Sequence, residues 1–194
     1  WLLGSIEGET REYYSGTFWT FVLDRQGRVV WYRRSGNVTM FARTSRDGSG
    51  ILVDECSFWS EFDGGDASAV HRLSLDMTGE RIPMPAMGYT YGELEPGTLL
   101  YGRVTGSWWA DTFTNELVEV APDGAETVLW NCTDWLETIE PGAAGFDCYP
   151  NAINYSPETG TILYSIVNRN TVVELDRQTG EVLRYFGEIP GGWS

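Results

Sequence analysis

The stretch from Phe21 to Arg34, FVLDRQGRVVWYRR, has apolar residues alternating with polar ones around the tetrapeptide Asp-Arg-Gln-Gly. Alternation with a period of two is typical of a β-strand, and a short Asp/Gly segment between two such runs is typical of a hairpin turn. The same form returns as RLSLDMTGERI from Arg72, LVEVAPDGAETVLW from Leu117 and VVELDRQTGEVLRYFG from Val172. The stretch therefore predicts one hairpin of a repeated β unit.

The turn acids of these hairpins set the length of the repeat. Asp24, Asp76, Asp123 and Asp176 are 52, 47 and 53 residues apart, and ~50 residues is typical of a four-stranded propeller blade. A second hairpin series lies between them, as ARTSRDGSGILVDE, GELEPGTLLYGRV and INYSPETGTILYSIV. Two hairpins per period give four strands, so we predict an all-β fold in which residues 1–194 form a single β-propeller module of about four blades.

Helical patterns are nearly absent from the sequence. In CTDWLETIE, Cys132 to Glu140, Thr133 or Asp134 is a typical N-cap, so we expect a short helix or turn before Pro141. The chain begins at Trp1 rather than Met. A four-bladed ring is one alternative, but we expect a partial ring whose open faces are covered by further blades of the same polypeptide or by neighbouring subunits.

Charge is the strongest bias of the composition. The chain has 28 acidic and 13 basic residues, a net charge of −15. Such a surface repels phosphate backbones, which argues against a nucleic-acid partner. No run approaches the ~20 apolar residues that a membrane span needs, so we expect no membrane span.

The three cysteines lack the spacing of a zinc site. A disulfide between Cys132 and Cys148, with Cys56 free, is one alternative, and three buried thiols are the other. An acidic, glycine-containing segment offers Glu61, Asp63 and Asp66 as weak calcium ligands. The default for that segment is a solvated loop without a cofactor, because its spacing is not that of an EF-hand.

Aromatic residues gather in the expected loops. Trp108 and Trp109 lie in a Gly/Ser/Asp/Thr segment rather than in an alternating strand. Flat aromatic faces bind sugars, phenols and the side chains of a partner protein. We therefore expect an aromatic or carbohydrate ligand near these residues.

The ordered set of hairpins, ending in FDCYPNAINYSPETGTILYSIVNRNTVVELDRQTGEVLRYFGEIPGGW, resembles the arylsulfotransferase family of β-propellers over nearly the whole chain. The resemblance implies a six-bladed, secreted or periplasmic protein that moves a sulfuryl group between phenols through a histidine. Such chemistry needs a nucleophilic imidazole, cationic or hydrogen-bonding partners for the sulfate oxygens, and an aromatic-lined mouth.

The residues at the positions implied by this resemblance differ from the family pattern. Where the family reads Asp-x-x-His-x-Asn, this chain has Asp147-Cys-Tyr-Pro-Asn151, which places Tyr149 at the histidine position. The family's arginine falls at Val167, although Arg169 lies two residues on and would share its strand face. A phenol ionises near pH 10, so Tyr149 and Arg169 are only weak candidates for catalysis, and we expect no catalytic residue in this segment.

Two further departures point the same way. A histidine-rich loop of the family is replaced by a segment with Tyr89, Thr90 and Tyr91, and the only histidine of the chain, His71, begins an expected strand. We therefore predict a secreted, non-catalytic binding or assembly module. Its ligand-binding residues would be Tyr149, Asn151, Asp147, Arg169, Tyr91, Trp108 and Trp109. The alternative is an active aryl sulfotransferase whose histidine lies outside this segment.

Overall fold

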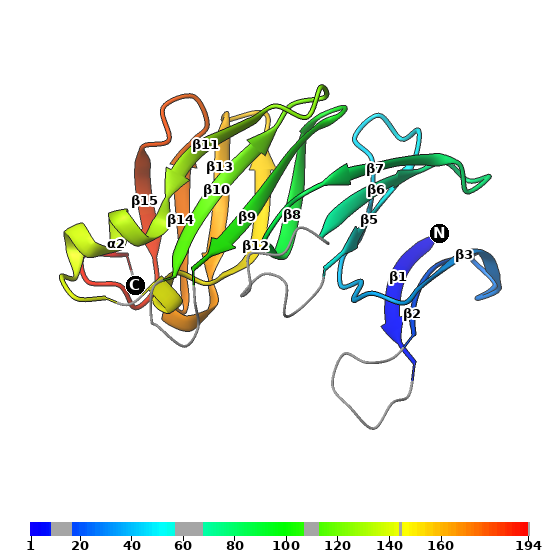
Figure 1. Cartoon of the computed structure of the whole chain (residues 1–194), viewed down its shortest axis with the longest axis horizontal. Coiled ribbons are helices and arrows are strands. Elements are labelled where there is room, and N and C mark those ends of the chain that lie inside the picture. The colour runs from blue at the N-terminus through cyan, green and yellow to red at the C-terminus, as the bar shows by residue number, and fades with distance from the viewer. Residues whose placement is uncertain (9–16, 57–67, 107–112, 144, 194) are drawn as a thin grey trace.

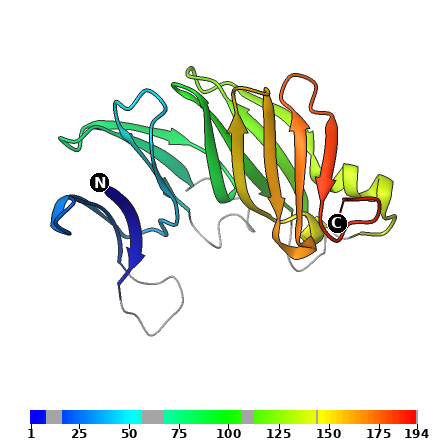
Figure 2. The same ribbon diagram turned by 180° about the vertical axis from the view of Figure 1, so that it is seen from behind.

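The computed structural model describes residues 1–8, 17–56, 68–106, 113–143 and 145–193. Figure 1 shows four antiparallel sheets that follow one another in chain order, and Figure 2 shows the same row from behind. The sheets form an arc rather than a closed ring. The prediction of an all-β fold is confirmed at this level, with four antiparallel sheets.

The first sheet contains β1 (Leu2–Glu7), β2 (Phe18–Leu23) and β3 (Val29–Ser35). It has three strands among the described residues, where the repeat predicts four. The second sheet contains β4 (Ala42–Thr44), β5 (Ile51–Glu55), β6 (Ala69–Leu73) and β7 (Gly79–Pro83). His71 lies in the middle of β6 rather than at its start.

The third and fourth sheets are complete four-stranded units. The third contains β8 (Met87–Glu95), β9 (Thr98–Thr105), β10 (Thr114–Val120) and β11 (Glu126–Asn131). The fourth contains β12 (Pro150–Ser156), β13 (Thr161–Ile166), β14 (Thr171–Asp176) and β15 (Val182–Phe186). In each sheet the strands pair in chain order, as repeated hairpins require.

The repeated aspartates stabilise the turns that join the last two strands of each sheet. Asp24 accepts hydrogen bonds from the backbone N–H groups of Gln26 and Arg28, at 2.9 and 3.0 Å. Asp176 likewise accepts hydrogen bonds from the backbone N–H groups of Gln178 and Thr179, at 2.9 and 2.8 Å. Asp76 and Asp123 each accept a hydrogen bond from the backbone N–H of the residue two positions on, Thr78 and Ala125. Both lie later in their turns than Asp24 and Asp176 do. The four acids share a role without being strictly equivalent positions.

The expected helix is present as α2 (Cys132–Ile139), and it is longer than a single turn. Its N-cap is Asn131, whose side chain accepts a hydrogen bond from the backbone N–H of Asp134. Thr133 and Asp134, the predicted caps, lie inside the helix. Thr133 instead accepts a hydrogen bond from the backbone N–H of Asn115 at 3.0 Å. In the described part of the chain, no helix is long and apolar enough to cross a membrane.

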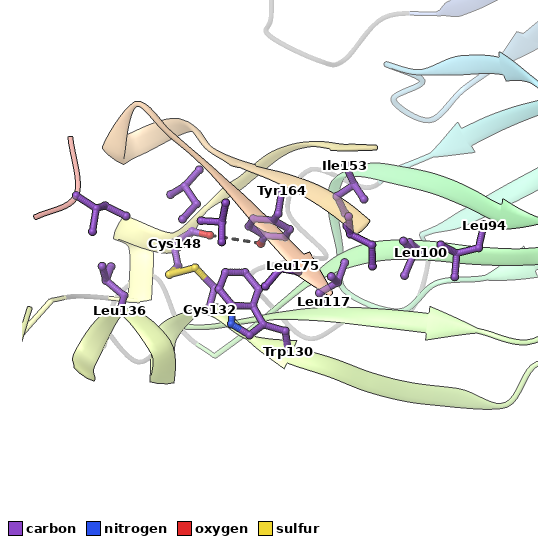
Figure 3. Close-up of a cluster of buried hydrophobic side chains, with 14 residues drawn as sticks. Leu94, Leu100, Leu117, Trp130, Cys132, Leu136, Cys148, Ile153, Tyr164 and Leu175 are labelled. Atoms are coloured by element: carbon purple, nitrogen blue, oxygen red, sulfur yellow. Dashed lines mark hydrogen bonds between the residues drawn. A yellow bond between two sulfur atoms is a disulfide. The ribbon is translucent and has the colours of Figure 1, made fainter. Parts of the chain in front are cut away.

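The core lies between neighbouring sheets. Between the third and fourth sheets, Leu100 and Leu117 pack with Ile162 and Tyr164, and Trp130 meets the ring of Tyr164 edge-on at 5.2 Å (Figure 3). Separate apolar clusters join the second sheet to the third and the first to the second. Stability therefore comes mainly from burying sheet faces against each other.

Candidate functional site

The stretch that carries the family-like loop is tied to α2 by a disulfide. Cys132, the first residue of α2, is bonded to Cys148, the last residue of the 3₁₀ helix η2 (Gly145–Cys148), and the two Cα atoms are 5.8 Å apart. Figure 3 shows this bond beside Trp130 and Tyr164 in the apolar core. The alternative of three buried thiols is excluded in this structure, where Cys56 alone is free and buried.

Tyr149 follows the disulfide and is largely buried, with 8% of its surface exposed. Its side chain packs with Val104 and Phe113, and its ring lies 6.1 Å from that of Phe146. Its backbone N–H donates to the carbonyl of Phe146, and its carbonyl accepts from the N–H of Val167. The residue at the family's histidine position therefore serves as a packing residue between the third and fourth sheets.

Arg169 does not lie on a strand face. Val167–Arg169 form the 3₁₀ helix η3, which corrects the prediction that Arg169 shares a strand face with Val167. The guanidinium forms ion pairs with Glu140 and, at 3.9 Å, with Asp147. Two carboxylates around one cation leave this cluster with a net negative charge, which disfavours an anionic ligand.

In the segment from Gly145 to Asn151, which we call the loop region, Phe146 and Asn151 are exposed. Phe146 is 37% exposed, and its ring lies 6.3 Å from that of Phe113. Its carbonyl accepts a hydrogen bond from the side chain of Asn168 at 2.8 Å. Asn151 is exposed at a bulge between Pro150 and Ala152 of β12. The loop region thus offers an aromatic face flanked by amide and carboxylate groups.

Phe146 was not predicted as a site residue, because a lone aromatic residue in a loop does not reveal whether it packs inward. Glu140 was missed because its pairing with Arg169 joins residues 29 positions apart. No local sequence signal indicates that pair.

Tyr91, which the sequence places among the ligand-binding residues, does not face an opening. It is fully buried, and its hydroxyl donates to the backbone carbonyls of Phe41 and Leu52 at 3.2 and 2.9 Å. Burial raises the pKa of its phenol well above the usual value. Tyr91 therefore joins the second and third sheets.

The sole histidine is also part of a contact between sheets. Nε2 of His71 lies 2.8 Å from Glu55, which also pairs with Arg33 of the first sheet at 2.5 Å. The hydrogen bond with His71 and the pairing with Arg33 hold the pKa of Glu55 at about 2, against the effect of burial. His71 is committed to this network and lies in a different interface from Tyr149.

Several predicted residues lie outside the described part of the chain. Trp108 and Trp109 fall within residues 107–112, and the calcium candidates Glu61, Asp63 and Asp66 fall within residues 57–67. Within the described residues, no group of three His, Cys, Asp or Glu side chains is arranged to hold a metal ion.

Gly145 fixes how closely the loop approaches the third sheet. A Cβ atom at this position would lie 2.0 Å from the carbonyl oxygen of Phe113, and the side-chain amide of Asn115 donates to the Gly145 carbonyl at 2.5 Å. Overpacking of this kind costs about 1–3 kcal/mol. We expect Gly145→Ala to lower the denaturant midpoint of unfolding accordingly. Gly36→Ala is the matched control, since its Cβ would meet no atom within 4 Å, and equal midpoints for the two variants would contradict the role assigned to Gly145.

No known protein-family model matches the sequence, and no curated protein is significantly similar to it. Among solved structures, a streptogramin B lyase aligns with 95% of this chain and 54% of its own, at 14% identity and a TM-score of 0.55. The Kuenenia stuttgartiensis hydrazine synthase aligns with 84% of this chain and 50% of its own, at 12% identity and a TM-score of 0.59.

A functionally unknown protein from Desulfotomaculum acetoxidans gives a TM-score of 0.51 at 15% identity, over 92% of this chain and 52% of its own. The likeness shows a β-propeller type of fold. The chain spans about half the length of these structures. Because the identities are low, the likeness carries fold and not activity.

Proposed function

We propose that this chain is a β-propeller binding or assembly module of arylsulfotransferase type that has lost the histidine chemistry, and that it works outside the cytoplasm, in the extracellular space or the periplasm. The burial of Tyr149 is the observation that carries the proposal. A nucleophile must reach its substrate, and this side chain is packed against Val104 and Phe113. The disulfide supports an oxidising compartment.

Electrostatics also disfavour sulfuryl transfer by these residues. An aryl sulfate donor is an anion, whereas the chain carries a net charge of −15. The arginine nearest to the loop, Arg169, is paired with Glu140 and Asp147. A transition state that spreads negative charge over sulfate oxygens needs cations or hydrogen-bond donors that are not already paired.

The ligand we propose is a neutral aromatic or carbohydrate group that stacks on the exposed ring of Phe146. Asn151 is exposed in the same region, and Asp147 is partly exposed beside Arg169. An aromatic face with amide and carboxylate groups at its edge suits a sugar or phenol ring, whose flat side is apolar and whose hydroxyl groups hydrogen bond. Neighbouring subunits are the alternative partners of this surface.

The first test is a sulfuryl-transfer assay with 4-nitrophenyl sulfate as donor and phenol as acceptor. In that reaction the donor's S–O bond breaks, the sulfuryl group joins the acceptor oxygen, and 4-nitrophenolate is released. We expect no release above the protein-free rate, and no mass increase of the protein after incubation with donor. Release that Tyr149→Phe abolishes would overturn the proposal and establish the chain as a sulfotransferase.

The second test measures binding by ligand-observed NMR with phenyl β-glucoside and phenyl sulfate. We expect the neutral glycoside to bind better than the sulfate, and Phe146→Ala to weaken its binding by about tenfold, the loss expected for one stacking contact. Leu75→Ala is the control, because Leu75 is 71% exposed on a turn of the second sheet. Equal binding by both variants would refute the site at Phe146.

A further inference from the structure

A cavity of about 510 Å³ lies between the first and second sheets. It is at the opposite end of the row of sheets from the loop region (Figure 1). Its wall comes from β2 and β3 of the first sheet and from β4, β5 and the turns of the second. Val22, Trp31 and Ile51 belong both to this wall and to the apolar cluster that joins the two sheets. The cavity therefore continues the interface between these sheets outward to solvent.

The cavity has a buried floor and an exposed rim. Trp31 and Ile51, which are 7% and 5% exposed, form the floor. Trp1 and Leu75, which are 82% and 71% exposed, lie at the rim. The volume is within the range of small-molecule pockets, about 300–1,000 Å³. The dimensions and the burial of the floor therefore suit a small molecule that enters past the rim.

The wall selects a neutral and largely apolar ligand. Among the described residues that line the cavity, the side chains are apolar apart from Thr44 and Ser49, and none is charged. The Ser49 hydroxyl already donates to Asp47 at 2.8 Å. The net charge of −15 disfavours an anion. The indoles of Trp1 and Trp31 add flat apolar surface, which suits a flat ring system.

Trp31 also brings a hydrogen-bond donor that lacks an acceptor. Its Nε1–H is buried and has no hydrogen-bond partner among the described residues. Buried indole N–H groups usually have such a partner. Because Trp31 lies in the cavity wall, a carbonyl oxygen on a ligand beside it supplies the acceptor. The unpaired donor thus adds one polar requirement to an otherwise apolar site.

We propose that this cavity binds a neutral, flat ligand of fused rings that carries a carbonyl oxygen. The rings pack on Trp31, Ile51 and the rim, and the oxygen accepts the Nε1–H of Trp31. The inference is independent of the proposed function, since a chain that binds nothing at Phe146 still has this cavity. Hydroxyl groups of a glycoside would stay unpaired against the apolar wall, so Leu75→Ala should leave binding of phenyl β-glucoside unchanged.

The test compares naphthalenes of nearly equal shape by equilibrium dialysis against the 194-residue chain. The probes are the ketone 2-acetylnaphthalene, the hydrocarbon 2-isopropenylnaphthalene and the anion 2-naphthoate. We expect one ketone molecule per chain, with the hydrocarbon bound about fivefold more weakly because it lacks one hydrogen bond. The anion should bind at least tenfold more weakly than the ketone. Absence of ketone binding, or an anion that binds as well as the ketone, would refute the proposal.

The variant Trp31→Phe tests the hydrogen bond separately from the packing. Phenylalanine keeps an aromatic ring but has no N–H group. The ratio of ketone affinity to hydrocarbon affinity should therefore fall from about five to about one, whatever the change in the two affinities themselves. Circular dichroism verifies that the variant folds. A ratio that stays at about five would show that Trp31 does not donate to the ligand.

The variant Trp1→Ala tests the place of binding, and its exposed side chain makes unfolding of the variant unexpected. Loss of one aromatic contact at the rim should weaken both neutral probes by about tenfold. Trp193→Ala is the matched control, because Trp193 is 70% exposed at the other end of the chain. Equal effects of the two variants would place the probes outside this cavity and overturn the proposal.

Discussion

Reduction of the disulfide between Cys132 and Cys148 should lower the free energy of unfolding by about 3 kcal/mol, the value expected when a loop of this size is closed in the unfolded chain. The bond joins residues 16 positions apart. It also holds η2 against α2 within the core between the third and fourth sheets. Denaturant unfolding with and without reductant measures the change.

Two variants separate this effect from other consequences of reductant. In Cys132→Ala/Cys148→Ala, the unfolding midpoint should be low and indifferent to reductant. In Cys56→Ala, the sensitivity to reductant should persist, because Cys56 is the free cysteine. A midpoint of the unaltered chain that reductant does not move would show that the bond does not stabilise the protein.

The hairpins and the repeat could be predicted from sequence because their signals are local. Alternating apolar residues and Asp/Gly turns act within about ten residues, and the strands appear where the four hairpins indicate. The N-cap of α2 was predicted at Thr133 or Asp134, two or three residues after the observed cap Asn131, because a contact with another strand decides its place. Thr133 is a good cap by type, but its hydroxyl is used by Asn115 of the neighbouring strand.

The candidate site was less predictable because its contacts join distant segments. The segment from Tyr89 to Tyr91 was expected to be a loop beside an opening, but it lies within β8, and the Tyr91 hydroxyl bonds to the second sheet. Arg169 was expected on a strand because the turn η3 has no strong sequence signal. Packing between sheets, rather than local propensity, decided both outcomes.

Tyr149 shows what sequence can indicate about such a loop. The sequence shows directly that position 149 is a tyrosine and not a histidine. It does not show that this tyrosine is buried, because the burial depends on packing against Val104 of β9 and Phe113, the residue before β10. The residue type at position 149 could therefore be read from the sequence, whereas its burial could be seen only in the structure.

The stability of this protein should depend on pH through Asp54. Its carboxylate is buried in β5 and accepts hydrogen bonds from the backbone N–H groups of Met40 and Phe41 at 2.9 to 3.1 Å. Burial raises the pKa of Asp54 to about 7, against the lowering effect of these hydrogen bonds. A group whose pKa is raised on folding stabilises the protein at pH below its unfolded value, and that stabilisation is lost as the pH rises through about 7.

Comparison with Asp54→Asn isolates this dependence, because asparagine keeps an acceptor oxygen for the two N–H groups but does not titrate. Between pH 4 and pH 8, the unaltered chain should lose about 3 kcal/mol of unfolding free energy relative to the variant. Glu55, whose pKa is lowered to about 2, stabilises the fold less as the pH falls below its unfolded value near 4.5, but it is present in both proteins, so its contribution cancels in the comparison. Urea unfolding of both proteins across the range measures the difference, and a difference that does not vary with pH would show that Asp54 is ionised in the folded state throughout.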